Sequence, residues 1–183
     1  MTPQVLTLPG WQSSGPAHWQ SRWEALHGYR RVEQHDWMQP LRGDWITRLE
    51  EVVQDTPGPI VFAAHSLGCL LTAAWASISR SVGRIQGVLL VAPPDTEDAS
   101  QATLRSAIRG WTPIPRQRLP FASIVVASRD DPFCRFDRAR ALAQDWGSTL
   151  HDLGNAGHVN ADSGLGDWPA GHALLQALMT ARP

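Results

Sequence analysis

The strongest chemical signal in the sequence is the pentapeptide Ala64-His65-Ser66-Leu67-Gly68. It joins an apolar run at 59–64 to a Leu- and Ala-rich run at 67–78, which predicts a sharp turn from a buried strand into a buried helix. Such a turn lifts a central serine above the edge of a sheet, provided that the residues two before and two after it are small. Alanine and glycine meet this need, although glycine is usual at the first position. A serine that only caps a core helix gives the same pattern, so a nucleophile needs partners elsewhere in the chain.

Two downstream residues supply such partners. Asp131 follows an apolar run at 123–127, and His158 lies in a Gly-rich loop after a weaker run at 149–153. A serine hydroxyl becomes a strong nucleophile when a histidine takes its proton and a carboxylate orients that histidine. The order serine, acid, histidine is the one expected along the chain for a serine at a turn of this kind. We therefore expect Ser66, Asp131 and His158 to be the catalytic residues.

The choice of acid rests on local chain geometry. Asp131 directly precedes Pro132, whose ring restricts the preceding residue to extended or turn conformations. Its neighbour Asp130 is expected to cap the loop or to face solvent. The remaining histidines are expected to be structural, with the alternative for His18 that it faces the pocket from the first helix. His65 is expected to point away from the serine that it precedes.

Two backbone amides are candidates to stabilise an oxyanion. Leu67 follows the serine at the start of a helix, and Trp11 follows Gly10 in the loop after the first apolar run. Pro9-Gly10 is also a common marker of an ordinary turn, so this second donor is the weaker prediction. Gly10, His18 and Trp19 are expected to contact the substrate, although the spacing of Trp19 and Trp23 also fits the buried face of a helix.

The fold is predicted from apolar strands that alternate with helical segments. This pattern indicates a single α/β domain over 1–183, with about six mostly parallel strands, helices on both faces and no large cap domain. The strands are expected at 5–8, 31–35, 59–64, 88–92, 123–127 and 149–153. A first helix carries Trp19, Trp23 and Leu26, with Ser14 as its cap and Pro16 in its first turn. The segment 93–120 is polar and rich in proline, which favours a loop or a short lid.

The composition excludes several classes of function. Sixteen basic and 17 acidic residues give a formal net charge of −1, which gives no basis for binding nucleic acid or an anionic membrane. The two cysteines and the lack of a leader-like N-terminus lead us to expect a cytoplasmic protein without disulfides. No zinc-binding spacing and no phosphate-binding loop occurs, so neither a metal nor a cofactor is expected.

The motifs together resemble the small serine hydrolases of the YdeN and retinoblastoma-binding-protein-9 family. The similar segments are Leu8-Pro9-Gly10-Trp11, Gly15-Pro16, His18-Trp19, Gln39-Pro40, Asp44-Trp45, the loop 127–133 and Gly157-His158-Val159-Asn160. The resemblance implies a compact α/β-hydrolase fold that lacks the first two strands of larger members. It also implies a catalytic triad of Ser66, Asp131 and His158.

The predicted reaction is hydrolysis of a small ester or amide through an acyl-enzyme. The alternative is a protein-binding module on a hydrolase scaffold with little catalysis, because a fold does not fix a function. A protein partner is possible on this view, but no residue pattern supports one. The shortness of the 93–120 segment predicts an accessible site for small acyl groups.

Overall fold

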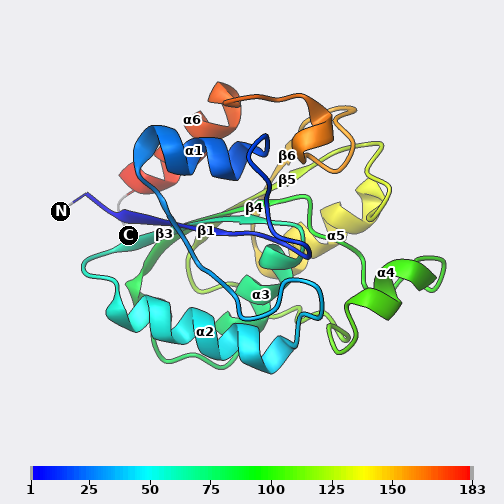
Figure 1. The fold of residues 1–183 in the computed structure, drawn as a ribbon, viewed down its shortest axis with the longest axis horizontal. Coiled ribbons are helices and arrows are strands. Elements are labelled where there is room, and N and C mark those ends of the chain that lie inside the picture. The colour runs from blue at the N-terminus through cyan, green and yellow to red at the C-terminus, as the bar shows by residue number, and fades with distance from the viewer. Residues whose placement is uncertain (1, 182–183) are drawn as a thin grey trace.

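Six parallel strands form one sheet at the centre of the molecule (Figure 1). The computed structural model describes residues 2–181 of the chain. The strands lie in the order β2-β1-β3-β4-β5-β6, and each neighbouring pair is parallel. Their bounds are Gln4–Leu8 for β1, Arg30–Arg31 for β2, Ile60–His65 for β3, Ile85–Val91 for β4, Ala122–Ala127 for β5 and Thr149–Asp152 for β6. All carboxyl ends of the strands therefore lie at one edge, where open α/β sheets bind ligands.

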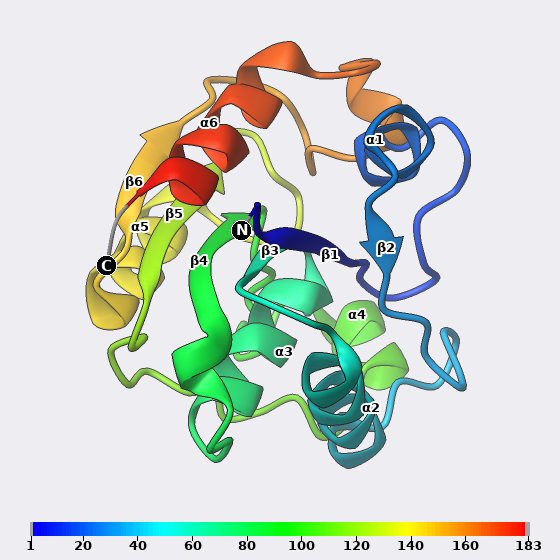
Figure 2. The ribbon, with the colours of Figure 1, turned by 90° about the vertical axis from the view of Figure 1, so that its left-hand side faces the viewer.

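Helices cover both faces of the sheet (Figure 2). α1 (Trp19–His27) and α6 (Pro169–Thr180) pack on one face. α2 (Arg42–Asp55), α3 (Leu67–Ala76) and α5 (Phe136–Trp146) pack on the other. The remaining helical pieces are the short α4 (Ala102–Ala107) and two 3-10 turns, Val82–Arg84 and Ala161–Ser163. No helix within residues 2–181 has the length and apolarity required to cross a membrane.

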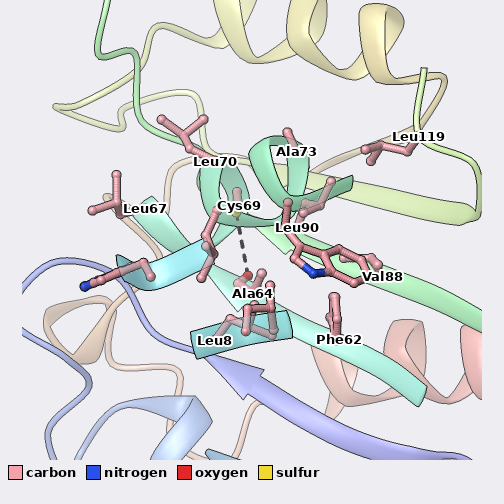
Figure 3. Packing of buried hydrophobic residues seen from close by; sticks show 14 of the residues in the cluster. Leu8, Phe62, Ala64, Leu67, Cys69, Leu70, Ala73, Val88, Leu90 and Leu119 are labelled. Atoms are coloured by element: carbon pink, nitrogen blue, oxygen red, sulfur yellow. Dashed lines mark hydrogen bonds between the residues drawn. The ribbon is translucent and has the colours of Figure 1, made fainter. Parts of the chain in front are cut away.

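The two central strands form the core because they carry apolar side chains on both faces. β3 is buried along its whole length, and β4 has a single half-buried residue. Burying each large apolar side chain contributes about 1.5–3 kcal/mol relative to leaving it exposed. Figure 3 shows Leu67, Cys69 and Leu70 of α3 above Leu8 and Ala64 of the sheet. The elbow between β3 and α3 therefore stands on a closely packed base.

Tryptophan fills much of this core. Six of the nine tryptophans are among the largest fully buried side chains. An indole N–H loses its bonds to water on burial, and each of these six donates to an acceptor in the chain. The acceptors are the carbonyl oxygens of Val159, Asp167, Asp36, Pro40 and Pro115 and the carboxylate of Glu50. The tryptophans thus fix loops and helix ends as well as filling volume.

The six-stranded parallel sheet predicted from the sequence is confirmed, with three local corrections. The second strand is only Arg30–Arg31, shorter than the run expected at 31–35. The first helix begins at Trp19, so Ser14 and Pro16 lie before it and the cap is His18, whose ring accepts from the N–H of Gln20. The segment 93–120 is not wholly irregular, because it contains α4.

We predict that Gly68→Ala destabilises the protein. A Cβ atom at this position would lie 2.1 Å from the carbonyl oxygen of Leu8, so β1 and α3 would have to separate. Overpacking of this kind costs about 3 kcal/mol, which thermal and denaturant unfolding would detect. The matched control is Gly43→Ala in α2, where a Cβ meets nothing within 4 Å. Alanine is the better helix former by about 0.5–1 kcal/mol, so the control should gain stability; equal loss in both variants would contradict the prediction.

Candidate active site

Ser66 occupies the turn between β3 and α3 in a strained backbone conformation. Its φ of 52° and ψ of −122° lie in a region that residues other than glycine rarely adopt. The turn is held by the N–H of Ser66, which donates to the carbonyl of Val91 at 2.9 Å. Beneath it, the thiol of Cys69 donates to the same carbonyl at 3.3 Å and lies 3.8 Å from the carbonyl of Ala64 (Figure 3). The surrounding hydrogen bonds and packing keep the serine in this conformation.

The two other predicted catalytic residues lie in line with Ser66. Nε2 of His158 is 2.9 Å from the hydroxyl of Ser66, and Nδ1 is 3.0 Å from each carboxylate oxygen of Asp131. An ionised carboxylate only accepts hydrogen bonds, so Nδ1 carries the ring proton and Nε2 presents its lone pair to the serine. The Asp131 side chain is only 3% exposed, and the N–H of Phe133 donates to it at 2.9 Å.

Asp130 has a different environment from its neighbour. Its side chain is exposed and accepts from the Ser128 hydroxyl at 2.7 Å and from the N–H of Gly157 at 2.8 Å. These hydrogen bonds lower the pKa of the Asp130 carboxyl. Asp130 therefore ties the loop after β5 to the loop that carries His158.

Further hydrogen bonds hold the loop that carries His158. The ring of His65 donates from Nε2 to the carbonyl of His158 at 2.9 Å, and the indole of Trp19 donates to the carbonyl of Val159 at 2.9 Å. Val159 has a φ of 50°, a conformation that a β-branched residue adopts only under constraint. The sequence offers no signal for the contact made by His65, because it joins residues 93 positions apart.

Trp19 requires a correction, because it does not line the cavity beside Ser66. Its indole is 1% exposed and packs edge-on against Trp23 and Trp168, with ring centroids 4.5 and 5.3 Å away. Trp19 lies on the buried face of α1 and points into the core. The spacing of Trp19 and Trp23 had this alternative interpretation. Its connection to the site is the hydrogen bond to the His158 loop.

A cavity of about 290 Å³ opens beside Ser66. This volume lies just below the usual range for small-molecule sites, which is about 300–1,000 Å³. Of the other predicted site residues, Trp11, His18, Leu67 and His158 line it, while Asp131 lies behind His158. Gly10 packs against Ser66 and is not among the residues that line the cavity, contrary to the prediction that it contacts the substrate. The cavity is also lined by residues that were not predicted to contact the substrate, among them Leu104, Ile108, Phe133 and Asn160.

Charged side chains hold the segment 93–120, part of which lines the cavity. Leu104 and Ile108 reach the cavity from the segment 93–120. Glu97 in the same segment accepts from the N–H of Ile114 at 2.9 Å and pairs with Arg116 at 2.6 Å. Arg138 of α5 pairs with Glu97 as well, which connects this segment to the helices on that face of the sheet. These bonds hold the segment on both sides of α4.

The loop after β1 approaches the elbow closely. A Cβ atom on Gly10 would lie 2.8 Å from Cβ of Ser66 and 3.0 Å from the nitrogen of Leu67. The amides of Trp11 and Leu67 are therefore close to the serine, and neither donates to another group in the described part of the chain. Two free N–H groups beside a serine hydroxyl can accommodate a negatively charged oxygen.

Two neutral histidines lie near the His158 ring, His65 beside it and His18 beyond His65. Burial, assisted by the charges of Arg31 and His158, lowers the pKa of His18 to about 3. Burial also lowers the pKa of His65 well below its ordinary value. The rings of His18 and His65 are 4.6 Å apart, and those of His65 and His158 are 5.0 Å apart. The site therefore contains three imidazoles, of which two stay uncharged near neutral pH.

A larger hollow of about 810 Å³ lies at the opposite edge of the sheet. Its described lining includes no serine, cysteine or histidine. The guanidinium of Arg84 there is occupied by the backbone carbonyls of Val53, Gln54, Thr56 and Gly58. Residues 2–181 also hold no group of three or more His, Cys, Asp or Glu side chains able to bind a metal. The cavity at Ser66 is thus the better candidate for chemistry.

A family model described as serine hydrolase matches residues 5–177, which is nearly the whole chain. The chain belongs to the serine hydrolase family. The fold and the resemblance predicted from the sequence are thereby confirmed, and hydrolase activity is supported. No curated protein matches the chain significantly.

Solved structures of similar hydrolases agree with this assignment. A YdeN-like hydrolase from Pectobacterium atrosepticum is 29% identical with a TM-score of 0.82, and the match covers 97% of this serine hydrolase and 91% of that chain. The ydeN gene product of B. subtilis is 20% identical with a TM-score of 0.76, over 98% and 100% of the two chains. A hydrolase of the α/β superfamily from Xanthomonas campestris is 19% identical with a TM-score of 0.66, over 98% and 99%. The last two matches show a shared fold.

We predict that acid destabilises this hydrolase partly through His18. Its pKa is about 3 in the folded protein, against an ordinary value of 6.5 in the unfolded chain. Between these values the unfolded state binds a proton that the folded state does not, so stability present at neutral pH is lost as the pH falls from 6.5 toward 3. His18→Asn preserves a good helix cap. It should reduce the slope of the free energy of unfolding against pH by up to about 1.4 kcal/mol per pH unit.

Urea unfolding between pH 4.5 and 7 measures this slope. The exposed His35 provides the control, and His35→Asn should keep the slope of the wild-type protein. Identical slopes for wild type and His18→Asn would show that the buried ring makes no contribution.

Proposed function

We propose that this protein hydrolyses small ester or amide substrates through an acyl-enzyme formed on Ser66. In this reaction, His158 removes the proton from the serine hydroxyl as the oxygen attacks the substrate carbonyl. Asp131 orients His158 and stabilises its imidazolium. The observation that carries the proposal is the continuous set of contacts from Asp131 through both ring nitrogens of His158 to Ser66.

The two backbone amides complete the proposed chemistry. Attack by Ser66 places negative charge on the former carbonyl oxygen, and the amides of Trp11 and Leu67 would donate to it. Collapse of this intermediate expels the alcohol or amine, which receives the proton held by His158. Water then attacks the acyl-enzyme with the same histidine as base, releasing the acid and restoring Ser66. The helix that begins at Leu67 adds a favourable dipole at the developing charge.

The cavity limits the size of the proposed substrate. A volume of about 290 Å³ bounded by Leu104, Ile108 and Phe133 favours short acyl groups with apolar contacts. A hydrolase with this site is therefore expected to lose catalytic efficiency as an acyl chain is lengthened beyond a few carbons.

We predict that a fluorophosphonate probe labels the wild-type protein at Ser66. The probe reacts with a serine only where a base activates its hydroxyl, so labelling reports the proposed nucleophile directly. Ser66→Ala should abolish both the label and the hydrolysis of p-nitrophenyl acetate. The exposed Ser100 provides a matched control, since Ser100→Ala should label as strongly as the wild-type protein. A folded wild-type protein without label would favour a binding module over an enzyme.

We predict opposite outcomes for the two adjacent aspartates. Asp131→Asn removes the negative charge that selects the His158 tautomer, and kcat should fall by roughly 10³–10⁴. Asp130→Asn keeps an oxygen that can accept from Ser128 and from the N–H of Gly157, so kcat should stay within about tenfold of the wild type. Steady-state kinetics with p-nitrophenyl acetate measures both. A collapse of kcat in Asp130→Asn, with Asp131→Asn active, would reverse the assignment of the acid.

A further inference from the structure

The two ring nitrogens of His18 have different partners. Nδ1 accepts a hydrogen bond from the N–H of Gln20 at 3.1 Å, because His18 caps α1. A nitrogen that accepts carries no proton, so the neutral ring must hold its proton on Nε2. The cap of the helix thus selects the tautomer of the ring.

Nε2 of His18 is buried and has no hydrogen-bond partner among residues 2–181. The residue is 4% exposed and lines the cavity that also holds Ser66 and His158. A buried donor without an acceptor is unfavourable, and such groups in folded proteins call for an explanation. The position of the ring in the cavity wall indicates that its acceptor comes from a bound molecule.

The surroundings keep His18 a neutral donor. Arg31 is fixed nearby by two bonds to Glu24, by the hydroxyl of Ser21 and by the carbonyl of Ser14. Its positive charge adds to the effect of burial and opposes a second charge on the His18 ring. A neutral His18 also avoids repelling the imidazolium that forms on His158 in the proposed reaction.

We propose that His18 determines specificity by donating from Nε2 to an oxygen acceptor of the substrate other than the carbonyl that is attacked. This inference rests on the proposed function, since it assigns the substrate class of the same site. Preferred substrates carry an ether, hydroxyl or carbonyl oxygen within a few bonds of the scissile ester or amide. The acceptor can belong to the acyl part or to the leaving group.

The walls around His18 make this donor selective. Trp11, Leu104, Ile108 and Phe133 offer mainly apolar surface. A hydrocarbon substrate would fill the cavity and leave the N–H unpaired, whereas an oxygen at the same place would satisfy it. A site built to hydrogen-bond a polar group rejects the analogue that lacks it more strongly than an apolar pocket distinguishes one methylene.

Pairs of esters that differ by one oxygen test the proposal. The acyl arm compares p-nitrophenyl methoxyacetate with p-nitrophenyl butanoate, in which CH2 replaces the ether oxygen. The leaving-group arm compares the butanoates of 2-methoxyethanol and of n-butanol, which locates the acceptor on the other side of the scissile bond. The quantity measured is the ratio of kcat/KM within each pair, divided by the same ratio for a His18 variant. This division cancels the intrinsic reactivity of the ether-bearing ester.

His18→Asn and His18→Ser are the informative variants. Both residues are preferred helix caps, so each retains the bond to Gln20 while its short side chain withdraws the donor from the cavity. The preference for the ether-bearing ester should fall roughly tenfold in one arm, which corresponds to the loss of about one hydrogen bond. His35→Asn, on the exposed His35, should keep the wild-type ratio.

The outcomes separate this inference from the proposed function. Hydrolysis by the wild type with ratios unchanged in both arms for both His18 variants overturns the specificity role alone. No hydrolysis and no fluorophosphonate label overturns the proposed function, and this inference with it. A measurement on the wild-type protein is independent of how the variants fold: long-range ¹⁵N–¹H NMR of the rings should find the His18 proton on Nε2. A proton on Nδ1 would overturn the inference.

Discussion

The site depends on how closely β1 and its following loop approach the elbow at Ser66. Gly68 lies against the carbonyl of Leu8, and Gly10 lies against Ser66 itself, so that a single methyl group at either position would collide with backbone or Cβ atoms. This contact supports the strained conformation of the serine and sets the amides of Trp11 and Leu67 beside its hydroxyl. The catalytic geometry proposed for this site would tolerate little displacement. The polar interactions of the site therefore depend on the close packing at these two glycines.

A second constraint acts on the loop that carries the histidine. Loops have few packing contacts of their own, yet the role of general base proposed for His158 requires a position held within a fraction of an ångström. Here hydrogen bonds to three separate elements fix the loop. His65 at the end of β3 and Trp19 in α1 donate to its carbonyls, and Ser128 after β5 accepts from the N–H of Ala156. The unusual number of tryptophans makes sense in this light. A buried indole fills core volume and offers one rigid N–H to a distant carbonyl.

Features that follow from the order of residues along the chain can be predicted from the sequence. Features that depend on tertiary packing cannot. Parallel strands place their carboxyl ends at one edge, so chain order alone predicts that Ser66, Asp131 and His158 lie together. The start of α1 could not be predicted, because Ser14 and Pro16 carry stronger capping signals than His18. Only the fold shows that the Ser14 hydroxyl donates to the side-chain oxygen of Gln20 instead of capping the helix. The bond from His65 to the His158 loop is a tertiary contact without any local pattern.

The three imidazoles of the site show how one residue type can hold different proton states within a few ångströms. His65 faces a carbonyl, which fixes its proton on Nε2, and His18 faces a backbone N–H, which fixes a lone pair on Nδ1. Burial disfavours a second proton on either ring, and within residues 2–181 no carboxylate pairs with either of them. His158 differs because Asp131 lies against its Nδ1. A proton leaving Ser66 in the proposed reaction therefore has one favourable destination, and the neutrality of the two neighbours preserves it.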